Sequence, residues 1–185
     1  MELVMHDDLE RFLEKPTAAR YRRVRRVVLQ SSEPGQRWHE LGELAGLCKA
    51  GRYRQAARKA ASMMPYWALS PRVHFFAAQA AENLKRPEDA ELERFLFGTC
   101  IDGLLSTGDG TAERPYLVTY VSDESDLLMA TGRRGRQQRL VEGDVGCYDA
   151  VTCDDGREVW FDVSDVYGGA PLVPLEELIL PEVPR

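Results

Sequence analysis

Two stretches of this chain share one pattern at a distance of 34 residues. Residues 50–56 read Ala-Gly-Arg-Tyr-Arg-Gln-Ala, and residues 84–90 read Leu-Lys-Arg-Pro-Glu-Asp-Ala. Each stretch follows one segment of helical character and opens another. These helical segments cover residues 38–49, 53–63, 72–83 and 87–98. A fixed period of this length with two helices per unit is typical of helical repeat arrays.

The residue types around the first turn suit a tight pair of antiparallel helices. Gly51 allows the chain to reverse, and Tyr53 can pack over the turn. Ala56 and Ala60 allow two helices to approach closely, and Pro65 follows where the second helix should end.

Residues 37–104 therefore resemble two tetratricopeptide-like repeats. The second repeat has Lys85 and Pro87 where that family favours glycine and an aromatic residue. Such arrays need about three repeats, and helices predicted over 6–14 and 17–30 would supply a third pair or a cap. An irregular helical bundle is the alternative.

The densest group of basic residues lies in the predicted second helix. Five of the seven residues 20–26 are arginines, a pattern that also occurs at nucleic-acid-binding surfaces. Tyr21, Val24 and Val28, however, recur at helical spacing and form an apolar stripe. We therefore expect an amphipathic helix with solvated arginines, and no nucleic-acid partner.

Charge divides the chain into two parts. Residues 1–97 hold 17 basic and 13 acidic residues, net +4, and residues 98–185 hold 7 and 17, net -10. This shift predicts two units with different surfaces. The total of -6 also disfavours a general nucleic-acid binder, while 44% hydrophobic residues suffice for a packed core.

The sequence favours a cytoplasmic location. No apolar run approaches membrane-spanning length, and the first eight residues have no signal-peptide pattern. Cys48, Cys100, Cys147 and Cys153 contain no Cys-x-x-Cys pair, so we expect buried free thiols. A disulfide between Cys147 and Cys153 is the alternative, if the geometry of their strand closes the distance.

The second half changes from helical to mixed patterning. A turn-rich linker over 106–111 leads to a module in the order β-α-β-β-β. Its helix follows residues 122–125, which supply an N-cap and first-turn acids, and stops at Gly132. The predicted strands cover residues 116–121, 137–141, 147–153 and 157–163.

Asp155-Gly156 predicts a two-residue hairpin turn between the last two strands. In the resulting register Asp149 and Asp162 lie directly opposite each other. Side chains alternate along strands, so these two acids share one face with Trp160 and Glu158. These four residues form a candidate ligand or partner face.

Like charges in a cross-strand pair repel each other, so Asp149 and Asp162 need an arginine, a cation or a shared proton. Three interpretations stay open. The acids are solvated or salt-bridged, or they bind a divalent cation together with Asp123 or Glu124, or they line a ligand or partner groove with Trp160.

Five short motifs follow one another in this half. They are Gly108-Asp109-Gly110-Thr111, Val121-Ser122-Asp123-Glu124, Gln138-Arg139-Leu140-Val141, Tyr148-Asp149 and Trp160-Phe161-Asp162. Their order resembles an uncharacterised bacterial family, a domain of unknown function whose members place tetratricopeptide-like helices before such a module. The resemblance covers roughly residues 45–168. It implies an architecture and brings no established activity, substrate or functional residue.

These patterns predict an α+β protein with N-terminal helical hairpins and a small, mostly antiparallel sheet module with one helix. The parts are a helical domain over 1–104, the module over 105–170 and an apolar C-terminal strap over 171–185. We expect the strap to dock on its own domain. An anchor for a partner or for a second copy of the chain is the alternative.

We expect a protein-interaction or scaffold module, because stacked repeat helices form a concave surface that holds peptides or helices. The candidate groove or packing residues are Trp38, Tyr53, His74 and Phe75. The partner is another protein or a peptide, with a homo-oligomer as one version.

The alternative function is a small-ligand or divalent-metal-binding β module that uses Asp149, Trp160 and Asp162, with hydrolytic chemistry in one version. No serine or cysteine lies in a nucleophile motif, so the sequence gives no positive indication of catalysis. We expect no cofactor.

Overall fold

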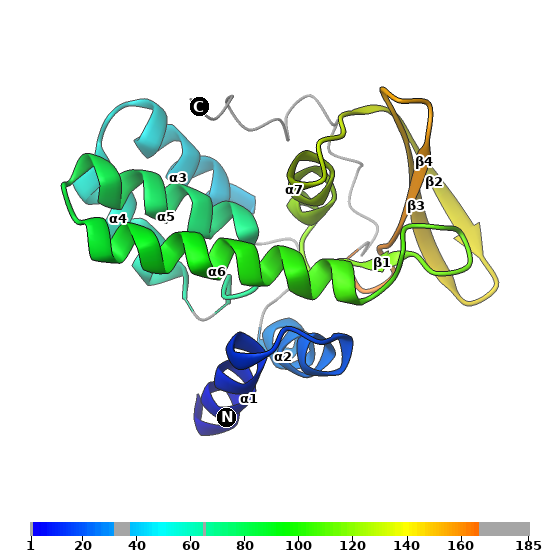
Figure 1. Cartoon of the computed structure of the whole chain (residues 1–185), viewed down its shortest axis with the longest axis horizontal. Coiled ribbons are helices and arrows are strands. Elements are labelled where there is room, and N and C mark those ends of the chain that lie inside the picture. Colours follow the sequence, from blue (N-terminus) through cyan, green and yellow to red (C-terminus); the bar gives the residue numbers. More distant parts are fainter. Residues whose placement is uncertain (1, 32–37, 65, 167–185) are drawn as a thin grey trace. The chain divides into compact units, whose positions relative to one another are not determined.

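The computed structural model describes residues 2–31, 38–64 and 66–166. In this described part, six helices precede a second region with one helix and a four-stranded sheet (Figure 1), which confirms the α+β class. The chain separates into two compact units, Met1–Thr107 and Gly108–Arg185. We call them the helical unit and the sheet unit, and we describe each by itself.

The helices of the helical unit lie where the apolar periodicity predicts them, and the last one continues well past its predicted end at residue 98. They are α1 (Glu2–Glu14), α2 (Ala18–Ser31), α3 (Trp38–Lys49), α4 (Tyr53–Met63), α5 (Pro71–Asn83) and α6 (Pro87–Ser106). In α2, Tyr21, Val24 and Val28 are fully buried, which confirms the predicted apolar stripe. Arg22, Arg23 and Arg26 are exposed, but Arg25 is only 6% exposed, so the expectation of solvated arginines is wrong at that position.

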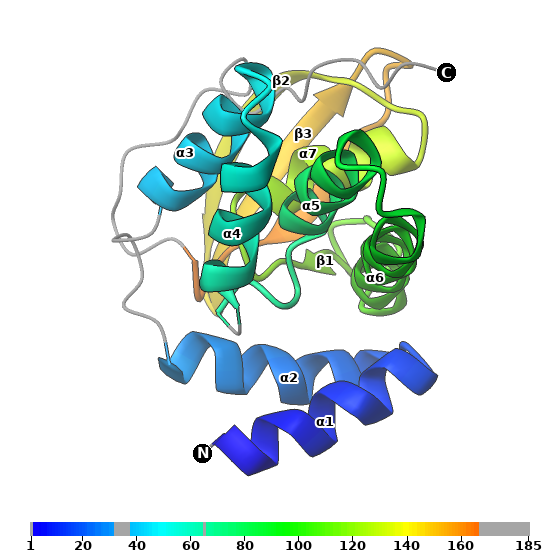
Figure 2. The same cartoon turned by 90° about the vertical axis from the view of Figure 1, so that its left-hand side faces the viewer.

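The α1–α2 pair packs on α6 at a glycine. Figure 2 shows α1 and α2 side by side, and both helices contact α6. The rings of Phe12 and Tyr21 lie 5.9 Å apart at 58°. A Cβ atom at Gly103 would come within 2.7 Å of Phe12 Cζ and 2.8 Å of Tyr21 Cδ2. Only glycine fits this contact without a shift of the rings.

The two turns of the 34-residue pattern are built alike. Gly51 has a φ of +68° and Lys85 a φ of +61°, so a lysine adopts the left-handed conformation that favours glycine. Both turns are Schellman motifs. Their hydrogen bonds are Gly51 N to Cys48 O (3.0 Å) and Arg52 N to Leu47 O (2.9 Å), and Lys85 N to Glu82 O (3.0 Å) and Arg86 N to Ala81 O (2.9 Å).

We expect Lys85→Gly to raise the free energy of unfolding by about 0.5–1 kcal/mol, because a non-glycine residue in the left-handed region costs about 1–2 kcal/mol. The greater freedom of glycine in the unfolded chain offsets part of that gain. Gly51→Ala is the matched substitution and should cost about 1 kcal/mol. Urea denaturation of both variants measures these changes. A stabilising Gly51→Ala would contradict the equivalence of the two turns.

The sheet unit holds a mixed sheet of order β1-β4-β3-β2. Strands β2–β3 and β3–β4 pair antiparallel, whereas β1 pairs parallel with β4. The elements are β1 (Tyr116–Leu117), α7 (Ser122–Ala130), β2 (Gly135–Gly143), β3 (Gly146–Cys153) and β4 (Glu158–Asp162). The sheet is therefore mostly antiparallel, with one parallel edge.

Strand β1 ends at Leu117, short of the predicted end at residue 121, because the Asp123 carboxylate binds the backbone N–H groups that would have continued the strand. Asp123 Oδ2 accepts hydrogen bonds from Thr119 N (2.8 Å) and Tyr120 N (3.0 Å). The chain turns there and enters α7. The N-cap residue of α7 is Val121, which makes no side-chain capping hydrogen bond, so the predicted N-cap in residues 122–125 is wrong.

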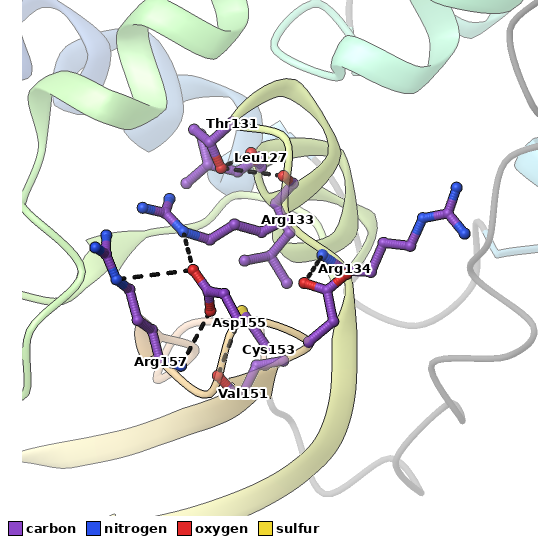
Figure 3. A network of polar contacts seen from close by, with 10 residues as sticks. Leu127, Thr131, Arg133, Arg134, Val151, Cys153, Asp155 and Arg157 are labelled. Atoms are coloured by element: carbon purple, nitrogen blue, oxygen red, sulfur yellow. Dashed lines mark hydrogen bonds and ion pairs between the residues drawn. The ribbon is translucent and has the colours of Figure 1, made fainter.

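The hairpin between β3 and β4 has three loop residues, so the predicted two-residue turn is wrong. Cys153 N donates to Arg157 O (2.7 Å), and Gly156 N donates to Cys153 O (3.0 Å). Gly156 has a φ of +78°, as expected for a type I turn followed by a glycine bulge. Figure 3 shows Asp155 between Arg133 and Arg157, with Nε to Oδ2 distances of 3.6 and 3.7 Å.

Candidate functional site

The extra loop residue moves Asp149 and Asp162 to opposite faces of the sheet. Asp149 pairs with Phe161, and Asp162 pairs with Tyr148. Asp149 is only 2% exposed, and Val151 and Phe161 on the same face are fully buried. The predicted opposition of Asp149 and Asp162 is therefore wrong, because a shift of one residue turns every side chain of a strand over.

The other three candidate residues of the sheet unit stay together on the outer face of β4. Trp160 Nε1 donates to Glu158 Oε2 at 2.9 Å, and Arg139 Nη2 of β2 donates to Glu158 Oε1 at 2.9 Å. The Arg139 guanidinium lies over the Trp160 ring, 5.1 Å from its centroid. The Trp160 N–H and both Glu158 oxygens are thus engaged within the sheet.

Asp162 closes the end of β4. Its Oδ1 accepts hydrogen bonds from Ser164 N at 3.1 Å and from Ser164 Oγ at 2.6 Å. Ser164 Oγ in turn accepts a hydrogen bond from Cys147 N at 3.0 Å. Through these contacts Asp162 holds the residues that follow β4 against the start of β3.

A buried carboxyl pair lies on the inner side of the sheet unit. Glu124 of α7 is 0% exposed and Asp149 of β3 is 2% exposed. Gln138 of β2 joins them, because its Nε2 donates to Glu124 Oε2 at 3.4 Å and also to Asp149 Oδ2. Three different elements therefore bring these side chains together.

The environment of the pair favours the neutral form of Glu124. Burial raises the pKa of Glu124 well above its usual value, and the negative charges of Asp149 and Asp123 raise it further. Burial also raises the pKa of Asp149, while hydrogen bonds from Gln138 and Glu124 oppose that rise. These directions favour a protonated Glu124 beside an ionised Asp149.

The second oxygen of each carboxyl group is buried without a partner among the described residues. Glu124 Oε1 and Asp149 Oδ1 are buried and accept no hydrogen bond from any residue that the structure describes. Across residues 2–31, 38–64 and 66–166, no three or more His, Cys, Asp or Glu side chains are grouped to hold a metal ion. The link through Gln138 and the raised pKa of both carboxyl groups favour one proton shared between them.

The candidate residues of the helical unit are mostly packing residues. His74 is buried, with Nδ1 2.7 Å from Glu93 Oε2 and Nε2 3.2 Å from Ala68 O. It thereby connects α5 to α6 and to the loop before α5. Phe75 and Tyr53 are half-buried. Trp38 opens α3, and its side chain lies outside the described residues.

A surface depression lies on the α3–α4 pair, and none of the four predicted groove residues lines it. The lining residues are Glu43, Gly46, Leu47, Arg52, Gln55, Arg58 and Lys59. Lys59 Nζ and Glu43 Oε2 form an ion pair of 2.8 Å across it.

Sequence reasoning missed an exposed apolar pair on α6. Leu92 is 56% exposed and Phe95 is 54% exposed. Glu88 and Asp102, which follow the same side of the helix, are also exposed. A helical projection of residues 87–106 separates this side from the buried Ala90, Ile101 and Leu104 and could have found it.

The cysteines are free thiols. Cys48, Cys100 and Cys153 are buried and Cys147 is partly so, and no disulfide joins Cys147 to Cys153. Cys48 Sγ donates to Phe76 O at 3.8 Å, and burial raises the pKa of the Cys48 thiol to about 11.

The sequence matches no family model, and it has no significant match among curated proteins or solved structures. The resemblance to an uncharacterised bacterial family therefore stays a prediction. No helix in the described ranges has the length and apolar content to cross a membrane. The predicted strap over 171–185 lies outside the described residues.

Proposed function

We propose that this chain is a cytoplasmic protein-interaction module that binds another polypeptide through helices α3–α6. The observation that carries the proposal is the identical construction of the turns at Gly51 and Lys85, 34 residues apart. Tandem helical hairpins of this kind present an extended surface to peptides or helices.

Packing between the hairpins supports the same proposal. Helix α5 contacts both α3 and α4, and it also packs along α6. The first helix of the second hairpin thus lies against both helices of the first, as in stacked tetratricopeptide-like repeats. The α1–α2 pair, which contacts α6, would serve as the additional helical layer that two repeats need.

The alternative, a metal- or ligand-binding sheet unit, has less support. Asp162 lies on the face opposite Asp149, and Trp160 is engaged by Glu158 and Arg139. Glu124 and Asp149 are two buried carboxyl groups, and one shared proton leaves the pair with a single negative charge instead of two. We therefore place the interaction surface on the helical unit.

Affinity capture with crosslinking tests the proposal. The tagged full chain is incubated with lysate of its source cells, treated with a carboxyl-reactive crosslinker and analysed by mass spectrometry. Carboxyl chemistry is needed because the lysines of this sequence are Lys15, Lys49, Lys59 and Lys85, whereas acids occur in both units.

A partner retained in stoichiometric amount should crosslink to acids of α3–α6. The Trp160→Ala variant of the full chain should retain it equally. Crosslinks confined to residues 108–166, loss of the partner in the Trp160→Ala variant, or the absence of any stoichiometric partner would contradict the proposal.

A further inference from the structure

One side of α6 is covered along only part of its length. Gly103 lies eleven residues after Leu92, which is close to three helical turns, so the two positions share a side of the helix. At Gly103 this side is covered by Phe12 and Tyr21 of the α1–α2 pair. At Leu92 and Phe95 it is more than half exposed.

The bare part of this side continues an existing helix–helix interface. Leu92 and Phe95 are three residues apart and therefore adjacent on the surface of α6. Their exposure, 56% and 54%, contrasts with the full burial of Phe12 and Tyr21 farther along. A helix laid on Leu92 and Phe95 would extend the layer that α1 and α2 begin.

The surroundings of the apolar pair are acidic. Glu88 precedes Leu92 by about one turn, Asp102 follows Phe95 by about two, and Glu91 lies beside them, all of them exposed. The cation nearest in sequence, Arg94, forms an ion pair with Glu82 of α5. This charge pattern favours a partner with Lys or Arg on both sides of its apolar residues.

We propose that the N-terminal half of α6 binds an amphipathic helix of a partner protein, with Leu or aromatic anchors flanked by Lys and Arg. This inference rests on the proposed function and specifies the partner's chemistry. The anchors pack on Leu92 and Phe95 in the manner of helix recognition by an apolar surface. The basic flanks face Glu88, Glu91 and Asp102.

A selection experiment tests this inference directly. The probe is a display library of 20-residue amphipathic helices with Leu, Ile, Phe or Trp at the apolar positions and Lys, Glu or Gln at the others. Binders are selected on the full chain, and the enriched sequences are read. We expect enriched helices with a net positive charge.

Binding of the selected peptides to variants locates the surface. Leu92→Ala combined with Phe95→Ala should weaken binding at least tenfold, because central anchors dominate such interfaces. Both side chains are exposed, so the fold should persist, and a circular dichroism melt checks this. Val145→Ala in the sheet unit is the control, since Val145 is also an exposed apolar residue, and it should change nothing.

Charge reversal gives a second and independent readout. The double variant Glu88→Lys, Asp102→Lys should bind the basic peptides more weakly. Selection on this variant should enrich library members that are rich in Glu. Neutral or acidic enrichment, unchanged binding to the Leu92/Phe95 variant, or no enrichment at all would overturn the inference. Peptides that crosslink to α3–α5 alone would overturn it and leave the proposed function standing.

Discussion

Replacing Glu124 by glutamine should stabilise the protein at pH 8 by about 1–3 kcal/mol, because a carboxyl group whose pKa burial raises costs about 1.4 kcal/mol per pKa unit once the unfolded chain is ionised. Glutamine has the shape of the protonated glutamic acid and donates a hydrogen bond to Asp149 without a titratable charge.

The sign of the pH dependence follows from the direction of the pKa shift. The folded protein holds the Glu124 proton more tightly than the unfolded chain does, since the pKa of Glu124 is raised well above the usual 4.5. The contribution of Glu124 to the stability of the wild type is therefore fully present below about pH 4.5 and is lost as the pH rises through the folded-state pKa. The Glu124→Gln variant lacks this loss.

Urea denaturation at pH 5 and pH 8 measures the effect. The advantage of Glu124→Gln should be larger at pH 8 than at pH 5. The matched control is Glu142→Gln, because Glu142 lies exposed in β2 and its replacement should leave the stability nearly unchanged at both pH values. A Glu124→Gln variant that is less stable than the wild type at pH 8 would contradict the shared-proton arrangement.

Gly103→Ala should destabilise the helical unit by about 1–3 kcal/mol, the typical cost of forcing extra volume into a packed core. The new Cβ atom would lie within 2.8 Å of atoms in both the Phe12 and Tyr21 rings, and both side chains are fully buried. Relief of this overlap requires movement of the α1–α2 pair away from α6.

The same substitution at Gly98 should have the opposite sign. Gly98 also lies in α6, but an added Cβ atom there meets nothing within 4 Å. Alanine is favoured over glycine in a helix by about 1 kcal/mol, so Gly98→Ala should stabilise the protein. Thermal melts of the two variants compare them directly. A neutral or stabilising Gly103→Ala would show that α1–α2 does not pack closely on this helix.

The helices could be predicted closely because their signals are local. Apolar spacing in residues 20–28 and turn residues near Gly51 specify helix faces and ends without reference to distant parts of the chain. Lys85 shows the limit of that approach, because a residue with no preference for positive φ adopts it where the surrounding helices require the turn.

The hairpin register could not be predicted from Asp155-Gly156 alone. That dipeptide fits both a two-residue turn and a three-residue loop with a glycine bulge. In the structure the loop is held by distant residues: Asp154 N donates to Arg134 O at 2.8 Å, and Asp155 forms an ion pair with Arg133 (Figure 3). These contacts join residues far apart in the sequence. The register that they accompany puts the Asp149 side chain on the face of the sheet opposite the predicted one.

The pairing of Glu124 with Asp149 could be predicted from the sequence only in part. Acids in the first turn of a helix are usually solvated and favourable there, whereas Glu124 is fully buried. The sequence indicated Glu124 as a candidate neighbour of Asp149, and the structure places the two together. The link through Gln138 depends on the pairing of β2 with β3, which no local pattern specifies.

The most direct test of the proposed interaction is photo-crosslinking from one side of α6. The full chain carrying p-benzoylphenylalanine at position 92 is irradiated in lysate of its source cells, beside a chain with the same residue at position 145. We predict an adduct at position 92 whose partner peptide is an amphipathic helix with basic flanks, and no such adduct at position 145. Equal adducts at both positions, or an adduct at position 145 alone, would contradict the account.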